Sequence, residues 1–386
     1  SVRRQGCHGQ LAVRDKIVRF VQAYLSGTHA SLDQRMAVVR DALLSENPKR
    51  QALGFQMLSA ALDGPPWMGS GLNDFGARPR DFGYQPNHDQ LVDWRNQFID
   101  LALDMGQRNN PELSGPARRV LAQEFRGLWH HQAMRGKLVE AARQLNATQP
   151  WVEGWKAVRS TIYFDYLKIK PDDEEKPIPE DLAALEHDLA PTNLLAKIRT
   201  YVLGGGHDHW ALDDEFDDDE AGKFDASKRR MSRQAEALGE EFACSGRPIS
   251  ELGQDLFSNA YMPYRLAFGR GLARGAPDRN AAWNELVEAL HILGSENYNF
   301  SVLSGFIDET DTQNRPAAQA LLDQCLTDSL LQAAIVGLTP SRSFDDNDLE
   351  RSIAALQNPE VGAWMYGDLL WRDSYAGLPD DRLLDL

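Results

Sequence analysis

Residues 31–62 read SLDQRMAVVRDALLSENPKRQALGFQMLSAAL, and this stretch predicts two consecutive helices. Apolar side chains recur at three- and four-residue intervals in both halves, which is typical of helices with one buried face. Ser31, followed three residues later by Gln34, predicts a capping box at the start of the first helix. Asn47-Pro48 supplies a cap and a first-turn proline for the second. Two helices joined by so few residues are expected to pack antiparallel.

The same apolar spacing continues along most of the chain, while no alternating run of β-branched residues is long enough for a strand. Gly106 is expected to end one of these helices and Pro116 to precede the next. The pattern predicts an all-α protein, an irregular α-solenoid of antiparallel helix pairs similar to HEAT or TPR repeats. The further stripes lie in residues 91–105, 120–129, 151–166, 182–189, 194–202, 231–242, 252–257, 283–293, 313–339 and 348–358.

A break in the pattern divides the chain into two arrays. Three glycines and a run of acids follow residue 203 with no apolar periodicity. We therefore expect an N-terminal helical subarray in residues 1–205, an acidic linker or loop in 206–226, and a C-terminal subarray in 227–386. Acidic runs are usually solvated, and we expect this of Asp213 to Glu220 and also of Asp345 to Asp348.

An inserted loop, residues 64–90, contains a seven-residue unit written twice: NDFGARP at 73–79 and RDFGYQP at 80–86. Long ordered loops commonly carry function. Paired guanidinium groups suit carboxylate or phosphate recognition. Each Asp-Phe-Gly can also form a local turn, so a purely structural lining of the helices stays an open alternative. The predicted partner-binding residues are Trp67, Asn73, Asp74, Arg78, Arg80, Asp81 and Tyr84.

Composition limits the function classes. Formal net charge is −16, which disfavours wrapping of nucleic acid, although the first forty residues are locally basic. Three dispersed cysteines without a CxxC pair indicate a reducing compartment, and no apolar run reaches the length of a membrane span. A cytoplasmic protein without membrane contact is therefore expected.

No catalytic motif emerges from the residues. Asp-Phe-Gly occurs in protein kinases, but the glycine-rich loop, lysine strand and catalytic loop that must accompany it are missing from this sequence. His207 and His209 beside Asp208, Asp213 and Asp214 match no metal-site spacing. His130-His131 is expected inside a helix, where neighbours face different directions. We predict no catalytic residue, no cofactor and no metal site.

The segment from Leu62 to Asp100, with its LDGPPW and NDFGARPRDFGY stretches and the Trp94-Arg95 helix after them, resembles helical C-terminal regions of large bacterial STAND-type antiviral NTPases. Residues 46–62 are similar to a HEAT-type helix. The resemblance implies the sensor arm of an antiviral defence NTPase that recognises a phage protein. It also implies an NTPase or effector module outside this chain and oligomers in the full-length context. The chain starts without Met, and residues 378–386 read as the opening of a helix, so we expect a fragment of a longer protein.

Three function hypotheses follow. The first is a non-catalytic helical-repeat scaffold that recognises a protein partner. The second is a hydrolase-like enzyme whose site is assembled only in three dimensions around the tandem Asp-Phe-Gly loop. The third, a nucleic-acid-binding array, requires a continuous basic stripe. Two convergent carboxylates with a perturbed histidine favour the enzyme, whereas a surface lined with arginine and aromatic residues favours the scaffold.

Overall fold

The computed structural model describes residues 17–23, 28–63, 84, 86–168, 176–204, 212–213, 223–293, 298–340 and 344–358. In these residues every regular element is helical, which confirms the all-α prediction. The chain divides into two compact units, Ser1–Ala190 (unit 1) and Pro191–Leu386 (unit 2). This division falls N-terminal to the expected boundary at residue 205.

Unit 1 consists of helices of two to five turns joined by short connections, with a π-helical turn, η1, directly after α7. Ser31 and Gln34 form the expected capping box, and Asn47 caps the next helix through its Oδ1. Asn110, which also precedes a proline, does the same. The elements are α2 (Leu32–Leu43), α3 (Pro48–Leu62), α4 (His88–Gly106), α5 (Pro111–Trp129), α6 (Gln132–Thr148), α7 (Val152–Ile162), η1 (Tyr163–Leu167) and α8 (Glu180–Leu189).

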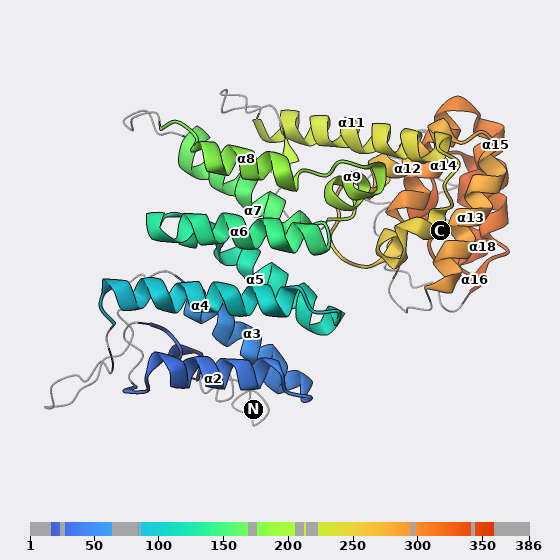
Figure 1. Ribbon diagram of the computed structural model, residues 1–386. Helices are drawn as coiled ribbons and strands as arrows, with labels where there is room; N and C mark the ends of the chain where they lie inside the picture. The colour runs from blue at the N-terminus through green and yellow to red at the C-terminus, as the bar shows by residue number, and fades with distance from the viewer. Residues whose placement is uncertain are drawn as a thin grey trace, which may run out of the picture. The chain divides into compact units, whose positions relative to one another are not determined.

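The helices of unit 1 alternate between two layers. Each helix from α2 to α5 packs on the next one and on the next but one, and α6 packs on α8; Figure 1 shows α2, α4, α6 and α8 one above another with α3, α5 and α7 behind them. Gly54 allows the closest approach, because a Cβ atom there would lie 2.7 Å from the backbone N of Leu43. Four tryptophans fill the space between the layers, namely Trp94, Trp129, Trp151 and Trp155.

Gly106 is the last residue of α4, as expected, and its missing side chain also makes room for Leu145. Two other expectations about helix ends in unit 1 are wrong. Pro116 lies inside α5 instead of before it, near the N-terminal end, where a proline removes one helical hydrogen bond. His130 and His131 lie between α5 and α6 and not within a helix.

Unit 2 is built around a short helix, α12, that packs tightly on α11 and α14. Two 3₁₀ turns, η2 and η3, replace the α-helix expected for residues 252–257. Helices α12 and α14 were not anticipated from the apolar pattern. The elements are α9 (Leu194–Tyr201), α11 (Lys223–Cys244), η2 (Ile249–Leu252), η3 (Gln254–Phe257), α12 (Arg265–Gly275), α13 (Arg279–Ile292), α14 (Ser301–Gln313), α15 (Arg315–Cys325), α16 (Ser329–Ala333), α17 (Ile335–Leu338) and α18 (Asp346–Ala355).

Glycines on both sides of α12 explain this close packing. A Cβ atom on Gly271 would lie 1.9 Å from the carbonyl oxygen of Glu236 in α11. A Cβ atom on Gly305 of α14 would lie 1.9 Å from the carbonyl oxygen of Leu266 in α12. Backbones can approach this closely only where no side chain separates them, so α12 is held by main-chain contact with both neighbours.

Candidate functional site

One edge of unit 1 collects the connections that follow α3, α5 and α7. Successive helices run in opposite directions, so the C-terminal ends of these three helices lie on the same side. Ser59 of α3 donates a hydrogen bond to Glu124 of α5 at 2.5 Å, and Arg126 of α5 pairs with Asp165 after α7 at 2.6 Å. We call residues 59–63, 84–88, 124–131 and 163–168 the loop edge.

The first part of the loop edge is where the inserted loop rejoins α4. The backbone N–H of Tyr84 donates to the carbonyl oxygen of Thr28 at 2.9 Å. The Arg35 guanidinium lies 5.9 Å from the ring centroids of both Tyr84 and Trp94. Tyr84 is therefore half-buried and fixed at the C-terminal end of the loop by main-chain and cation–π contacts.

Arg35 itself is a structural residue. Its Nη1, Nη2 and Nε donate to the carbonyl oxygens of Gln22, Thr28 and Ala30, at 2.6, 3.2 and 3.1 Å. The side chain is buried, and burial lowers its pKa. The locally basic N-terminal segment therefore loses one of its exposed charges to the interior, which weakens the nucleic-acid hypothesis.

The other predicted partner-binding residues lie outside the described residues, and so do the loop phenylalanines and four of the candidate metal ligands considered in the sequence. These residues are Trp67, Asn73, Asp74, Arg78, Arg80, Asp81, Phe75, Phe82, His207, Asp208, His209 and Asp214.

The second part of the loop edge is an aromatic and cationic cluster on η1. The Arg126 guanidinium lies 5.0 Å from the centroid of the Phe164 ring, and the Lys168 ammonium lies 5.6 Å from the same centroid. Tyr163 meets Phe164 edge to face at 5.0 Å. These rings are half-exposed, whereas most tryptophans of unit 1 are in the core. π-Helical turns often occur at functional sites, because the extra residue redirects the side chains that follow.

Asp165 holds the cations of this cluster in place. Its Oδ1 accepts from both Nε and Nη2 of Arg126, at 2.9 and 2.6 Å, and its Oδ2 lies 2.9 Å from Nε2 of His130. The carboxylate is only 15% exposed, while the Arg126 and His130 side chains are 44% and 57% exposed. The arrangement therefore presents the Arg126 guanidinium to solvent and keeps the Asp165 carboxylate below it.

His131 is a titratable group of the loop edge whose pKa is shifted. Burial lowers its pKa, and the nearby charges of Arg95, His130 and His88 lower it further. A neutral imidazole could accept a proton, but no residue of the cluster described here places a carboxylate on it. The charged groups that lower its pKa come from α4 and from the α5–α6 connection, so these two segments lie close together at this edge.

Sequence reasoning did not anticipate the η1 cluster. The signal was the run Tyr163-Phe164-Asp165-Tyr166, in which three aromatic residues crowd a helix end next to Lys168. In a helix, only the residues on one face of this run can point into the core. The remaining rings had to be placed at the surface, and that is where the structure has them.

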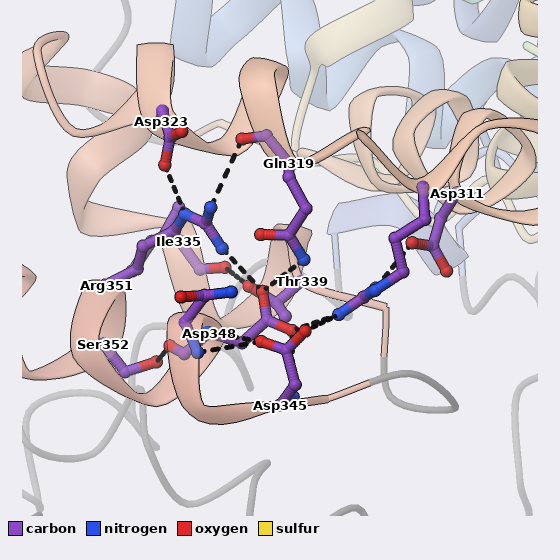
Figure 2. A network of polar contacts seen from close by, with 11 residues as sticks. Asp311, Gln319, Asp323, Ile335, Thr339, Asp345, Asp348, Arg351 and Ser352 are labelled. Carbon is purple, nitrogen blue, oxygen red and sulfur yellow. Dashed lines mark hydrogen bonds and ion pairs between the residues drawn. The ribbon is translucent and has the colours of Figure 1, made fainter. Parts of the chain in front are cut away.

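A second convergence of carboxylates lies at the start of α18 in unit 2 and tests the enzyme hypothesis (Figure 2). Oδ2 of Asp345 and Oδ2 of Asp348 both accept from Nη2 of Arg315, at 2.6 and 3.0 Å. Nη1 of the same guanidinium donates to Asp311 at 2.6 Å. Acid–base catalysis commonly uses two carboxyl groups whose different environments give them different pKa values.

Asp348 is nevertheless saturated with donors. Besides Arg315, it accepts from Nη1 of Arg351 at 2.9 Å, from Nε2 of Gln319 at 3.4 Å and from the backbone N–H of Asp345 at 3.1 Å. The side chain is fully buried, and burial raises its pKa. A carboxylate with four donors and no solvent contact cannot reach a substrate, so this network stabilises unit 2.

Two acidic runs expected to be solvated are thus partly internal. Asp348 is buried, and so is Asp213, which pairs with Arg230 in bidentate fashion: Nη2 lies 2.6 Å from Oδ2 and Nε lies 2.9 Å from Oδ1. The prediction of solvation is wrong for these residues because guanidinium groups replace their water. Asp213 is accordingly engaged in an ion pair with Arg230.

No metal centre is found in the part of the chain that the structure describes, and Cys325 is buried there. No group of three or more His, Cys, Asp or Glu side chains there is placed to hold a metal ion. Burial raises the pKa of Cys325 to about 12, and its Sγ bonds to the carbonyl oxygen of Leu321 at 3.2 Å. A thiol in that state is a packing residue.

Among the described helices, none is long and apolar enough to cross a membrane. Comparison of the chain with protein-family models, with curated proteins and with solved structures finds no match. Any function must therefore be argued from the residues of this chain.

Proposed function

We propose that this chain is a non-catalytic helical scaffold that recognises a protein partner through the loop edge of unit 1. The observation that carries the proposal is the η1 cluster, in which half-exposed Phe164 and Tyr163 are accompanied by the cations Arg126 and Lys168. Exposed aromatic and arginine side chains are the types that dominate protein interfaces, whereas isolated charges contribute little.

The layered packing of unit 1 supports a scaffold role. The contacts of α2, α3, α4 and α5 with the next two helices are what an irregular α-solenoid of antiparallel pairs, similar to HEAT or TPR arrays, produces. Such arrays expose connections along one edge, and here the inserted loop 64–90 rejoins the helices at the same edge, next to Tyr84. The predicted arginines of that loop would then extend the same surface.

The sequence resemblance extends this proposal to a cytoplasmic sensor arm of a bacterial antiviral NTPase that recognises a phage protein. The extension rests on residues 62–100 alone. The carboxylates examined above are engaged by arginine, which supports a binding role over the hydrolase alternative.

Partner capture tests the proposal. The immobilised chain is incubated with extract of its native cells, with and without infecting phage, and retained proteins are identified by mass spectrometry. Proteins retained by the wild type are then purified and their affinity measured for a Tyr163→Ala/Phe164→Ala variant. We expect at least a tenfold weaker affinity, since interface anchors typically contribute about 2 kcal/mol or more.

A matched control separates a specific surface from general stickiness. Tyr261→Ala/Ile292→Ala removes two exposed apolar side chains from unit 2, which are 59% and 71% exposed. This variant should bind as the wild type does. The proposal fails if no protein is retained, or if both double variants lose affinity equally while their melting temperatures stay unchanged.

A further inference from the structure

Within the part of the chain that the structure describes, the cations of the η1 cluster are more numerous than the anions that engage them. Asp165 pairs with Arg126 and His130, and it uses only Nε and Nη2 of the guanidinium. Nη1 of Arg126 has no hydrogen-bond acceptor among the described residues. The Lys168 ammonium has aromatic rings as its neighbours there, and none of the described carboxylates pairs with it.

Both cations lie against one ring. Their distances of 5.0 and 5.6 Å from the Phe164 centroid place them within about 11 Å of each other, close to the screening length of about 8 Å at physiological ionic strength. A carboxylate that docks beside these cations gains charge-assisted hydrogen bonds from donors that have no acceptor among the described residues.

Lys168 is exposed and Arg126 is 44% exposed, so both charges are accessible. The chain as a whole carries −16, and two cations are too few to follow a nucleic-acid backbone against that charge. A short acidic stretch of protein, by contrast, needs only one or two cations and can place an apolar side chain on the rings.

We infer that Arg126, Lys168 and the Phe164 ring form a binding site for an acidic peptide segment with an apolar side chain. This inference rests on the proposed function and specifies the chemistry of the partner. Nη1 of Arg126 and Nζ of Lys168 receive carboxylates, while Phe164 and Tyr163 receive the apolar group. Asp165 and His130 act as positioning residues that hold the guanidinium.

Fluorescence anisotropy with defined probes tests the site on the full chain. The probes are fluorescein-labelled EEEFEEE and its uncharged counterpart QQQFQQQ. At about 50 mM salt we expect the glutamate peptide to bind at least tenfold more tightly than the glutamine peptide, with an affinity that falls as salt rises. Arg126→Gln and Lys168→Gln should each weaken binding of the glutamate peptide at least fivefold.

Arg119→Gln is the matched control, because it removes the same charge from the exposed face of the same helix. It should leave the affinity unchanged. Equal binding of both peptides, equal loss in the Arg119 and Arg126 variants, or tighter binding of a labelled twelve-nucleotide RNA than of the glutamate peptide would each overturn the inference.

A protein retained in the partner-capture experiment distinguishes failure of the acidic-peptide site from failure of the proposed function. If the partner is lost from Tyr163→Ala/Phe164→Ala but binds Arg126→Gln/Lys168→Gln normally, the scaffold role stands and the acidic site is wrong. If no partner depends on the rings, the scaffold role itself is wrong, even where the glutamate peptide binds.

Discussion

Arg35, Arg118 and Arg265 each place a buried guanidinium among backbone carbonyl oxygens. Arg118 donates to the carbonyls of Leu145 and Gln149, at 3.1 and 2.5 Å, where α6 ends. Arg265 donates to four carbonyl oxygens between residues 255 and 260, the closest at 2.6 Å. Burial lowers the pKa of all three side chains. Each guanidinium satisfies carbonyls that irregular backbone would otherwise leave buried without donors.

These hydrogen bonds to carbonyl oxygens predict that a positive charge alone cannot substitute for the Arg35 guanidinium. Lysine keeps the charge but has a single ammonium, which cannot reach three carbonyls arranged for a planar fork. We expect Arg35→Lys to lower the unfolding free energy by about 2 kcal/mol, in the range of buried hydrogen bonds to charged groups. Denaturant titration provides the measurement.

Arg40→Lys is the control for this change, since Arg40 is exposed on the same helix. It should alter the unfolding free energy by less than about 0.5 kcal/mol. If Arg35→Lys were equally mild, the carbonyl contacts of Arg35 would contribute little and the ring of Tyr84 would be held by other means.

At the scale of the element, α12 shows how glycines can determine where a helix packs. Its sequence RLAFGRGLARG has three glycines, and glycine is a poor helix former. The helix exists because main-chain atoms of α11 and α14 lie where side chains would otherwise be. Arg270 and Arg274 add ion pairs to carboxylates on both neighbouring helices, with closest distances of 2.7 and 3.0 Å to Asp308 and Glu309.

Substitution of these glycines by alanine should therefore be destabilising, even though alanine has a higher helix propensity than glycine. We expect Gly271→Ala to lower the unfolding free energy by about 3 kcal/mol, because its Cβ atom would clash with the Glu236 carbonyl and separate α11 from α12. Calorimetry or denaturant titration measures the effect.

Gly337 provides the comparison within unit 2, because a Cβ atom there would meet no atom within 4 Å. Gly337→Ala should be neutral or should stabilise by about 0.5 kcal/mol. A stabilising Gly271→Ala would show that α12 can move away from α11 without loss, and that the close packing is incidental.

At the scale of the whole molecule, the two units differ in how their carboxyl groups titrate. In unit 2, burial alone would raise the pKa of Glu309, Asp328 and Asp345, but hydrogen bonds from arginine, histidine or backbone N–H groups lower it. In unit 1, burial raises the pKa of Glu124, and the neighbouring Asp63 raises it further against the hydrogen bond from Ser59.

Lowered and raised carboxyl pKa values change the pH dependence of folding stability in opposite directions. A carboxyl group with a lowered folded-state pKa adds stability that is present above its unfolded pKa of about 4 and is lost as pH falls through the folded value. A group with a raised pKa, such as Glu124, adds stability below its unfolded pKa and loses it as pH rises. Asp348, with its raised pKa, opposes the trend within unit 2.

Unit 2 should therefore lose stability before unit 1 on acidification from about pH 6 to pH 3. Hydrogen exchange of backbone amides, measured by mass spectrometry and corrected for the intrinsic rate at each pH, follows the two units separately. Arg315→Gln removes the main partner of Asp345 and should flatten the pH dependence of unit 2. Earlier loss of protection in unit 1 would contradict the prediction.

The sequence alone determined the helical class and the local signals at helix ends. The capping residues Ser31 and Asn47 act where they were predicted to act, because a cap depends on side chains within three residues of it. The apolar stripes were equally reliable where large residues mark one face, as for Trp94 and Phe98 in α4. The loop residues from Trp67 to Asp81 stay predictions.

Tertiary structure decided the rest, since it depends on atoms that are distant in sequence. Helix α12 forms despite its glycines because two other helices supply contact, and Asp348 is buried because Arg315 and Arg351 reach it from α15 and α18. The η1 cluster likewise required Arg126, far along the chain, to meet Phe164. Propensity and periodicity describe one segment at a time, whereas burial of a charge or close approach of two backbones is a property of the partners that folding brings together.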